Sequence, residues 1–380
     1  MALLNVAFIG CGAVNFGGAE GPWNHSKRLE LIQNIHFVAI MDVDISKANR
    51  VLETKLQGEA AAKYTECKIF SNLDDLFSQM KGRIDAVWVG VPPYVHGVLD
   101  EGRDLELRCI REGINVFMEK PISVYPVKDV SLYADAIEKE TTGQGKPYFS
   151  VGYMFRYHPA IIQAKEILNS HSQPILMINA RYNCAYSELD HPFWWNKKES
   201  GGPIVEQATH FCDLFRFFGG EVNLNSVTSK IIPAGDKGKI GYLSTVPDVV
   251  KEDKLPLDDR VPRVTVSHFY FKSGALGSLT HGITLHAKRY EASIDIWCDG
   301  LRILLEEPYS NELCRLRVRK GYTDTEELFA FPGADCYMEE DLAFVRAVLE
   351  RNPALIASNY SDALQSYKLS WSITDSVQKE

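Results

Sequence analysis

Two segments of the chain carry side chains suited to moving a proton. Glu206 and His210 are four residues apart, and a predicted helix over 205–218 would place both on one face. A carboxylate that orients a histidine makes a common acid/base pair, because imidazole titrates near neutral pH. Lys120 directly follows an apolar run that predicts a strand, so its side chain is expected to point into a crevice at the strand end. On these residues alone, two other interpretations remain. Glu206 and His210 could be an ordinary pair on the surface of a helix, and Lys120 could be a surface lysine in a turn.

A glycine-rich turn near the N-terminus predicts a nucleotide site. In the run Gly10-Cys11-Gly12-Ala13-Val14-Asn15, the first glycine allows a tight turn and the second lets the backbone approach a pyrophosphate. Asn15 stands where such motifs have a third glycine, and an ordinary strand-to-helix turn is the alternative. Asp42 ends the next predicted strand, where it can bind ribose hydroxyls and would repel a 2′-phosphate. The pattern favours NAD over NADP, although Lys47 and Arg50 keep NADP open.

Aromatic and polar residues further along are candidate substrate contacts. The neighbouring indoles of Trp194 and Trp195, with Asn196 beside them, could stack on the face of a sugar or equally cap a sheet. Tyr153 and Arg156 follow a predicted strand and could reach the same ligand. The remaining histidines have no carboxylate or cysteine partners at metal-ligand spacing, so no metal site is predicted.

Five short apolar runs, separated by helix-compatible segments, must position these residues. The runs are 5–9, 36–41, 68–70, 84–91 and 114–118. Apolar strands that alternate with helices predict an α/β fold with a parallel sheet covered on both faces. Such sheets collect functional residues at the carboxyl ends of their strands, here the glycines, Asp42, Pro92 and Lys120. Asn72 predicts the start of a helix over 73–80.

The pattern changes after about residue 145. A turn-rich linker, 142–147, precedes segments rich in β-branched and aromatic residues that hairpin turns separate. These segments are 148–153, 175–182, 264–271, 275–285 and 292–305. They predict an antiparallel sheet packed by a few helices, among them 159–168, with a long charged surface excursion at 237–260.

These patterns predict two domains. Residues 1–125 form a dinucleotide-binding domain, and residues 126–380 form an α+β domain with a large open, mainly antiparallel sheet. For the tail helices within 337–377, packing back on the first domain is one option. A ligand is expected in a cleft between the two domains.

Composition and charge exclude several classes of protein. A hydrophobic share of 45% supplies ample material for packed cores, which excludes a largely disordered chain. The 41 Lys and Arg against 50 Asp and Glu give a net charge of −9, so nucleic acid is not an expected partner. No apolar stretch approaches the roughly 20 residues of a membrane span, no signal peptide is evident, and the eight cysteines form no CxxC pair. These features predict a reduced, cytoplasmic protein without a membrane partner.

Taken together, the motifs resemble the Gfo/Idh/MocA oxidoreductases, named for glucose–fructose oxidoreductase and inositol dehydrogenase. The matching segments, in the order of the family, are 10–12, Asp42, 91–96, 119–121 and 201–210. The resemblance implies a Rossmann domain followed by an α/β domain whose open sheet often serves in oligomers. It also implies that Lys120 is the catalytic lysine and His210 the acid/base histidine. Glu206, where relatives commonly have aspartate, is the third catalytic candidate.

The resemblance implies a reversible, NAD-dependent oxidation of a secondary alcohol on a sugar, polyol or related cyclic compound. The candidate cofactor-binding residues are Gly10, Gly12, Ala13, Val14, Asn15, Asp42, Val91, Pro92, His96, Glu119 and Lys120. The loops 16–22 and 97–105 are expected near the cofactor, and a homodimer or homotetramer is expected. The alternatives are an NADP-dependent carbonyl or imine reductase, a redox-neutral, NAD-dependent glycoside-cleaving enzyme, and a non-catalytic sensor.

Overall fold

The computed structural model describes residues 3–18, 21–287 and 289–377. It divides the chain into two compact units, of which the first comprises Met1–Met154 with Tyr337–Leu364 and the second Phe155–Cys336 with Gln365–Glu380. The first unit therefore extends beyond the predicted boundary at 125/126 and includes part of the tail. Among the described residues, no helix is both long and apolar enough to cross a membrane.

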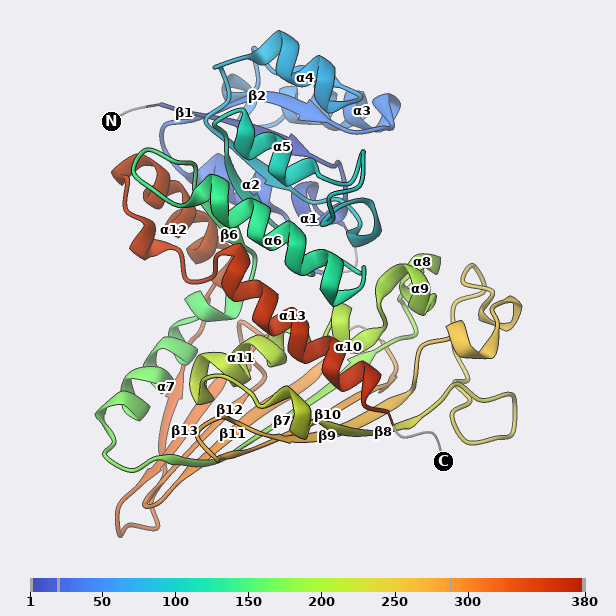
Figure 1. The fold of residues 1–380 in the computed structure, drawn as a ribbon, viewed down its shortest axis with the longest axis vertical. Coiled ribbons are helices and arrows are strands. Elements are labelled where there is room, and N and C mark those ends of the chain that lie inside the picture. The colour runs from blue at the N-terminus through green and yellow to red at the C-terminus, as the bar shows by residue number, and fades with distance from the viewer. Residues whose placement is uncertain (1–2, 19–20, 288, 378–380) are drawn as a thin grey trace. The chain divides into compact units, whose positions relative to one another are not determined.

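The first unit is built on a parallel sheet of six strands (Figure 1). The strands are β1 (Leu4–Ile9), β2 (Ile35–Met41), β3 (Lys68–Phe70), β4 (Ala86–Val89), β5 (Asn115–Met118) and β6 (Phe149–Val151). Their order is β3-β2-β1-β4-β5-β6, and every neighbouring pair is parallel. The central strands are buried on both faces, which explains why the sequence shows continuous apolar runs instead of alternation.

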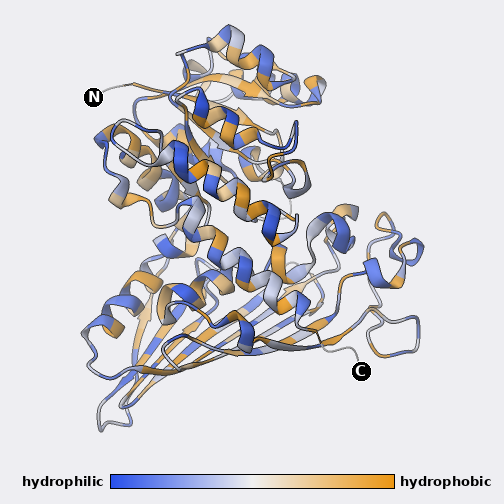
Figure 2. Cartoon of the chain, in the orientation of Figure 1, coloured by the Kyte–Doolittle hydropathy of each residue, from blue (hydrophilic) through white to orange (hydrophobic). Residues whose placement is uncertain are grey.

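Helices cover this sheet, and all of them except α12, which comes from the tail, lie between its strands in the sequence. They are α1 (Ala13–Phe16), α2 (His25–Leu31), α3 (Ile45–Leu56), α4 (Leu73–Met80), α5 (Leu105–Arg111), α6 (Val127–Thr141) and α12 (Cys336–Glu350). The Asn72 side chain accepts a hydrogen bond from the Asp75 backbone and caps α4, as predicted. Figure 2 shows hydrophobic and hydrophilic residues on opposite sides of α4 and α6, the pattern of helices that cover a sheet.

Strand β6 corrects one prediction from the sequence. The segment 148–153 was expected to belong to the antiparallel sheet of the second domain, and this was wrong. β6 pairs in parallel with β5, and Gly152 N donates to Met118 O at 2.8 Å. A three-residue strand carries too little pattern to distinguish a parallel from an antiparallel partner, so only the tertiary fold decides.

The second unit contains a mixed sheet of eight strands, mainly antiparallel as predicted. The strands are β7 (Ile175–Ala185), β8 (Thr228–Ile232), β9 (Val264–Tyr270), β10 (Leu276–Leu285), β11 (Glu291–Cys298), β12 (Leu301–Glu306), β13 (Arg315–Lys320) and β14 (Glu327–Ala330). Their order is β14-β13-β12-β11-β7-β10-β9-β8, and only β7 and β10 pair in parallel among the neighbouring described strands. The pair β9–β10 is a hairpin between two segments that the sequence predicted, and β11–β12 is a hairpin that divides the predicted segment 292–305.

Helices lie on one face of this sheet (Figure 1). They include α7 (Pro159–Ser170), α8 (Pro192–Trp195), α9 (Lys197–Ser200), α10 (Pro203–Glu206) and α11 (Thr209–Gly219), and the last turns of α13 (Tyr360–Asp375) belong to the same unit. Along β9, buried and exposed residues alternate, and Val266 and Tyr270 are exposed, as is Trp297 of β11. The outward face of the sheet therefore carries large apolar side chains.

The predicted helix over 205–218 is interrupted, so that prediction was wrong in one respect. α10 ends at Glu206 and α11 begins at Thr209, so Glu206 and His210 do not share one continuous helical face. The break is stabilised by tertiary contacts of Gln207, whose side-chain amide donates to Cys184 Sγ at 3.1 Å and pairs with His281 Nε2 at 3.2 Å. These buried hydrogen bonds outweigh the small preference for a continuous helix.

Candidate active site

The turn after β1 has the geometry that a dinucleotide requires. Gly10 has a φ of +92°, and a Cβ there would lie 2.5 Å from Gly90 O, so both the conformation and the close approach favour glycine. A Cβ on Gly12 would meet only Gly90 O, at 3.5 Å, with no other described neighbour within 4 Å. The backbone at Gly12 can therefore approach a bulky ligand group, which fits a pyrophosphate.

Asn15 explains why the third glycine of the motif can be absent. Its buried amide Nδ2 donates to Gly10 O at 2.8 Å and to Ile9 O at 3.3 Å, so it closes the turn that α1 begins. A Cβ on Gly90 would lie 2.5 Å from Val14 Cγ1 and 2.7 Å from Asn15 Nδ2. The close packing usually supplied by a third glycine is supplied here by Gly90, on the neighbouring strand end.

Asp42 directly follows β2, and its side chain is hydrogen-bonded to the turn that follows β1. Its Oδ2 accepts a hydrogen bond from Cys11 N at 2.6 Å, and its Oδ1 accepts one from Asp44 N at 2.9 Å. A carboxylate offers about four acceptor positions, so ribose hydroxyls can still bind. Burial and the Asp42 carboxylate raise the pKa of the Cys11 thiol to about 12, which keeps this cysteine a neutral side chain beside the turn.

The strand order reverses between β1 and β4, and ligands of open parallel sheets bind at such a point. Val91, which follows β4, lies against the glycine turn: its Cγ1 is 2.8 Å from the position of a Cβ on Gly10. Pro92 directly follows Val91. His96 is buried, and its Nδ1 lies 2.7 Å from Glu106 Oε1. The imidazole thus lies beside a carboxylate of α5.

Lys120 lies directly beyond the carboxyl end of β5, and a hydrogen-bonded chain fixes its backbone. Glu119 Oε2 accepts from Lys120 N at 3.2 Å, and Glu119 Oε1 pairs with His25 Nε2 at 2.9 Å. His25 Nδ1 lies 2.8 Å from Asp341 Oδ1, which also accepts from Trp88 Nε1 at 2.8 Å. Burial opposes protonation of His25, but the carboxylates of Asp341 and Glu119 raise its pKa well above the ordinary value.

In the second unit, His210 stands among aromatic rings. Its ring centroid is 5.5 Å from that of Phe155 and 6.3 Å from that of Tyr309. The rings of Tyr182 and Tyr309 lie 5.4 Å apart, and burial raises the pKa of both phenols well above the ordinary value, so they stay neutral. An imidazole surrounded by neutral rings suits a group that must accept and release one proton.

The Glu206 carboxylate is held by an indole. Trp194 Nε1 donates to Glu206 Oε2 at 2.8 Å, and Trp195 Nε1 donates to Leu189 O at 2.8 Å. Both indoles are buried, which favours the packing alternative over stacking on a sugar. Asn196 caps α9 by accepting from Lys198 N at 3.1 Å.

Tyr153 and Arg156 fall in different units. Tyr153 is buried at the end of the first unit. Arg156 forms a two-pronged ion pair in the second unit, with Nε 2.8 Å from Asp213 Oδ2 and Nη2 2.6 Å from Asp213 Oδ1. Ser366 Oγ donates to the same Oδ1 at 2.9 Å. These contacts give the guanidinium a structural partner.

Several residues near these sites escaped sequence analysis. Tyr182 faces inward from β7, and only the alternation along that strand could have indicated it. Tyr309 follows β12 in a loop without a recognisable motif. His281 and Gln207 pair with each other, and burial lowers the pKa of His281 to about 3, so this histidine is neutral.

The loops 16–22 and 97–105, which were expected near the cofactor, make different contacts in the structure. Within 16–22, Gly17 has a φ of +87° and Asn24 Nδ2 donates to Phe16 O at 3.2 Å, whereas Ala19 and Glu20 lie outside the described residues. In 97–105, a Cβ on Gly97 would lie 2.4 Å from Ile122 O. This second loop therefore packs closely on the segment that follows Lys120.

Comparison with known proteins identifies both parts of the chain. Residues 4–142 match the family model described as "Oxidoreductase family, NAD-binding Rossmann fold", and residues 156–301 match a model of an oxidoreductase C terminal domain. The uncharacterized protein UNK4.17 of Schizosaccharomyces pombe is 36% identical over 378 residues, which cover 97% of this chain and 90% of that protein.

Two further similarities concern named enzymes. Inositol 2-dehydrogenase 2 of Saccharopolyspora erythraea is 27% identical over 168 residues, which cover 44% of this chain and 41% of that enzyme. The crystal structure of KijD10, a 3-ketoreductase from Actinomadura kijaniata in complex with NADP and TDP-benzene, superposes with a TM-score of 0.71 at 15% identity. That superposition covers 99% of this chain and 98% of KijD10 and shows a shared fold. With its NAD-binding Rossmann domain and matching second domain, the chain belongs to the Gfo/Idh/MocA family of oxidoreductases.

Proposed function

We propose that the protein is a dehydrogenase that oxidises a secondary alcohol of a sugar, polyol or related cyclic compound, with NAD as the preferred cofactor. The observation that carries the proposal is the position of Lys120, at the carboxyl edge of the nucleotide-binding sheet with its backbone held by Glu119. A lysine at this edge is suited to contact a substrate oxygen next to the cofactor. The partial similarity to an inositol dehydrogenase supports the substrate class.

Each catalytic side chain has a distinct role in this proposal. The bound nicotinamide supplies the hydride chemistry. Lys120 Nζ donates a hydrogen bond to the substrate oxygen and stabilises the negative charge that develops there. His210 accepts the hydroxyl proton, and Glu206, anchored by Trp194, binds a neighbouring hydroxyl or orients the acid/base groups.

The open face of the eight-stranded sheet supports a second part of the proposal, a homodimer or homotetramer. Val266, Tyr270 and Trp297 are exposed on this face, whereas helices such as α7 and α11 pack on the other. Exposed large apolar side chains on one face of a sheet favour burial against another subunit.

The preference for NAD should depend on Asp42. Replacing Asp42 by alanine removes the carboxylate that accepts ribose hydroxyls and repels a 2′-phosphate, so the ratio of NAD to NADP affinity should fall about tenfold or more. Titration of the wild type and of Asp42→Ala with NAD and with NADP, followed by quenching of the intrinsic tryptophan fluorescence, measures this ratio. An Asp44→Ala variant is the matched control, because Asp44 caps α3 and should leave the ratio unchanged. An unaltered ratio in Asp42→Ala would place Asp42 away from the ribose.

Cofactor reduction by the purified chain tests the proposed activity. NAD and NADP are offered in parallel with pools of sugars, polyols and sugar acids, and absorbance of the reduced nicotinamide is followed. We expect NADH to accumulate with the wild type and much more slowly with His210→Gln. If cofactor binds but neither reduced form accumulates, the proposed net oxidation is wrong. The result would then favour one of three other functions: a reductase of another metabolite, a redox-neutral enzyme or a sensor.

A further inference from the structure

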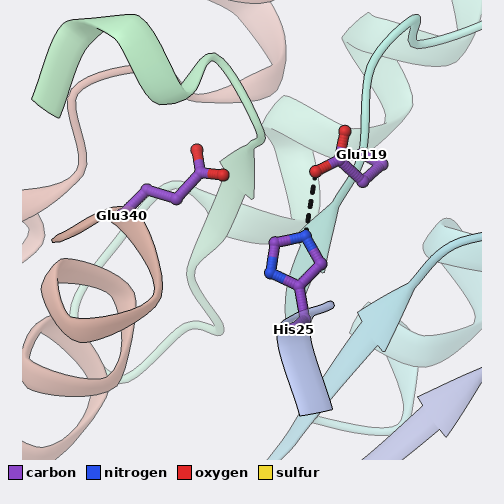
Figure 3. Close-up of side chains that lie close together, drawn as sticks. All are labelled: His25, Glu119 and Glu340. Carbon is purple, nitrogen blue, oxygen red and sulfur yellow. Dashed lines mark hydrogen bonds and ion pairs between the residues drawn. The ribbon is translucent and has the colours of Figure 1, made fainter. Parts of the chain in front are cut away.

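Three side chains converge beside the Glu119–Lys120 turn in a cluster that the proposed reaction does not use. His25 comes from the start of α2, Glu119 follows β5 and Glu340 comes from α12 (Figure 3). One ligand atom from each residue lies within 4.8 Å of those of the other two. The exposed fractions are 1% for His25, 11% for Glu119 and 0% for Glu340, so the cluster is nearly closed to solvent.

Glu340 is the member whose burial lacks an explanation. Both of its carboxylate oxygens are buried, and neither has a hydrogen-bond partner among the residues that the structure describes. Figure 3 shows its carboxylate directed into the space that it shares with His25 and Glu119. Burying a carboxylate without a partner is strongly unfavourable. A proton would remove the charge, but the resulting hydroxyl would still lack an acceptor among these residues.

We propose that His25, Glu119 and Glu340 bind one divalent transition-metal ion, with Zn²⁺ as the best match. One imidazole nitrogen with carboxylate oxygens is a ligand set that Zn²⁺ accepts. The far nitrogen of His25 is already held by Asp341 at 2.8 Å, the support that metal-binding histidines commonly receive.

The spacing of the ligand atoms is compatible with a bound ion. Zinc holds nitrogen and oxygen ligands at about 2.0–2.2 Å, so two ligands of one ion lie roughly 3–3.5 Å apart. His25 Nε2 and Glu119 Oε1 are 2.9 Å apart, and the whole cluster spans at most 4.8 Å. The 4.8 Å limit exceeds the spacing in a filled site, so the side chains would have to move closer together when the ion binds.

Charge balance also favours a cation here. Three carboxylates, of Glu119, Glu340 and Asp341, face two groups that can carry positive charge, the His25 imidazole and the Arg28 guanidinium. When the ion binds, it replaces the proton on His25 Nε2, and that proton leaves to solvent. The ion would connect α2, the end of β5 and α12, and it would fix the carboxylate whose other oxygen holds Lys120 N.

Zinc titration of the full-length, tag-free protein tests this site. After treatment with a chelator and dialysis, the wild type should bind one Zn²⁺ per chain in calorimetry, and excess Zn²⁺ should raise Tm by roughly 5 °C. Glu340→Gln keeps the side-chain shape and should weaken zinc binding about 100-fold or more. Glu106→Gln is the matched control, because Glu106 is equally buried and pairs with His96 at 2.7 Å but belongs to no such cluster within the described chain.

X-ray absorption at the zinc edge of the wild type gives an independent reading. The proposal predicts nitrogen and oxygen ligands at about 2.0–2.2 Å, whereas binding to the eight free cysteines would give sulfur at about 2.3 Å. Absence of bound zinc, sulfur ligands, or equal affinity in Glu340→Gln would each overturn the proposal. If Glu340→Gln fails to fold, the wild-type spectrum and stoichiometry decide.

Discussion

Replacing Lys120 by alanine should lower kcat about 1,000-fold while the dissociation constant of NAD changes by less than about threefold. The variant loses the Nζ donor to the substrate oxygen, but it keeps the backbone N–H that donates to Glu119 Oε2. The glycine turn and Asp42, which we propose hold the cofactor, are untouched. Steady-state kinetics with the substrate found in the pool assay and fluorescence titration of NAD measure the two quantities.

Two further variants make this prediction specific. Lys128→Ala removes an exposed lysine from α6 in the same unit and should retain full activity. Lys120→Arg keeps the charge but not the position of the donor, so it should recover only a small part of kcat. Turnover close to that of the wild type in Lys120→Ala would remove Lys120 from the proposed mechanism.

Replacing Asp213 by asparagine should lower the free energy of unfolding by about 3–5 kcal/mol. The substitution leaves the Arg156 guanidinium, whose side chain is 7% exposed, beside a neutral amide at a site that is 1% exposed. Ser366 can still donate to the amide oxygen, so the loss reflects the charge pair and the amide NH2 that would face the Arg156 Nε donor. Urea unfolding followed by circular dichroism measures the change.

The control for this prediction is an ion pair of the same chemistry at the surface. Arg346 of α12 also holds a carboxylate with two contacts, 2.8 and 3.4 Å from the oxygens of Glu350, but these side chains are 52% and 47% exposed. Glu350→Gln should therefore lower the free energy of unfolding far less than Asp213→Asn does. If Asp213→Asn is as stable as the wild type and loses substrate affinity instead, the role of Arg156 is to bind the substrate and not to stabilise the fold.

The nucleotide-binding half of the fold was largely predictable because its signals are local. The strands β1 to β5 are apolar runs, and the turn residues Gly10 and Gly12 follow directly on β1. In such units the strand ends fix where the chemistry lies, so Asp42 and Lys120 could be assigned to one edge of the sheet from spacing alone. The predictions for individual site residues remain predictions.

What the sequence could not predict depends on contacts between distant residues. His25 and Asp341 are 316 positions apart, and nothing near either residue indicates the other. The break between Glu206 and His210 likewise arises from the pairing of Gln207 with His281, 74 positions away. Local propensity favours a continuous helix there, and only the tertiary hydrogen bonds reverse that preference.

The division of the chain has a consequence for its synthesis. The polypeptide passes from one unit to the other after Met154, after Cys336 and after Leu364. The ring of Phe344 in α12 lies 5.2 Å from that of Trp88 and 5.7 Å from that of Phe117. Until the ribosome has synthesised α12, the side chains of Trp88 and Phe117 lack their contact with Phe344. The core of the nucleotide-binding unit therefore cannot be completed before α12 has been synthesised, and until then the nascent chain exposes the apolar side chains that α12 later covers.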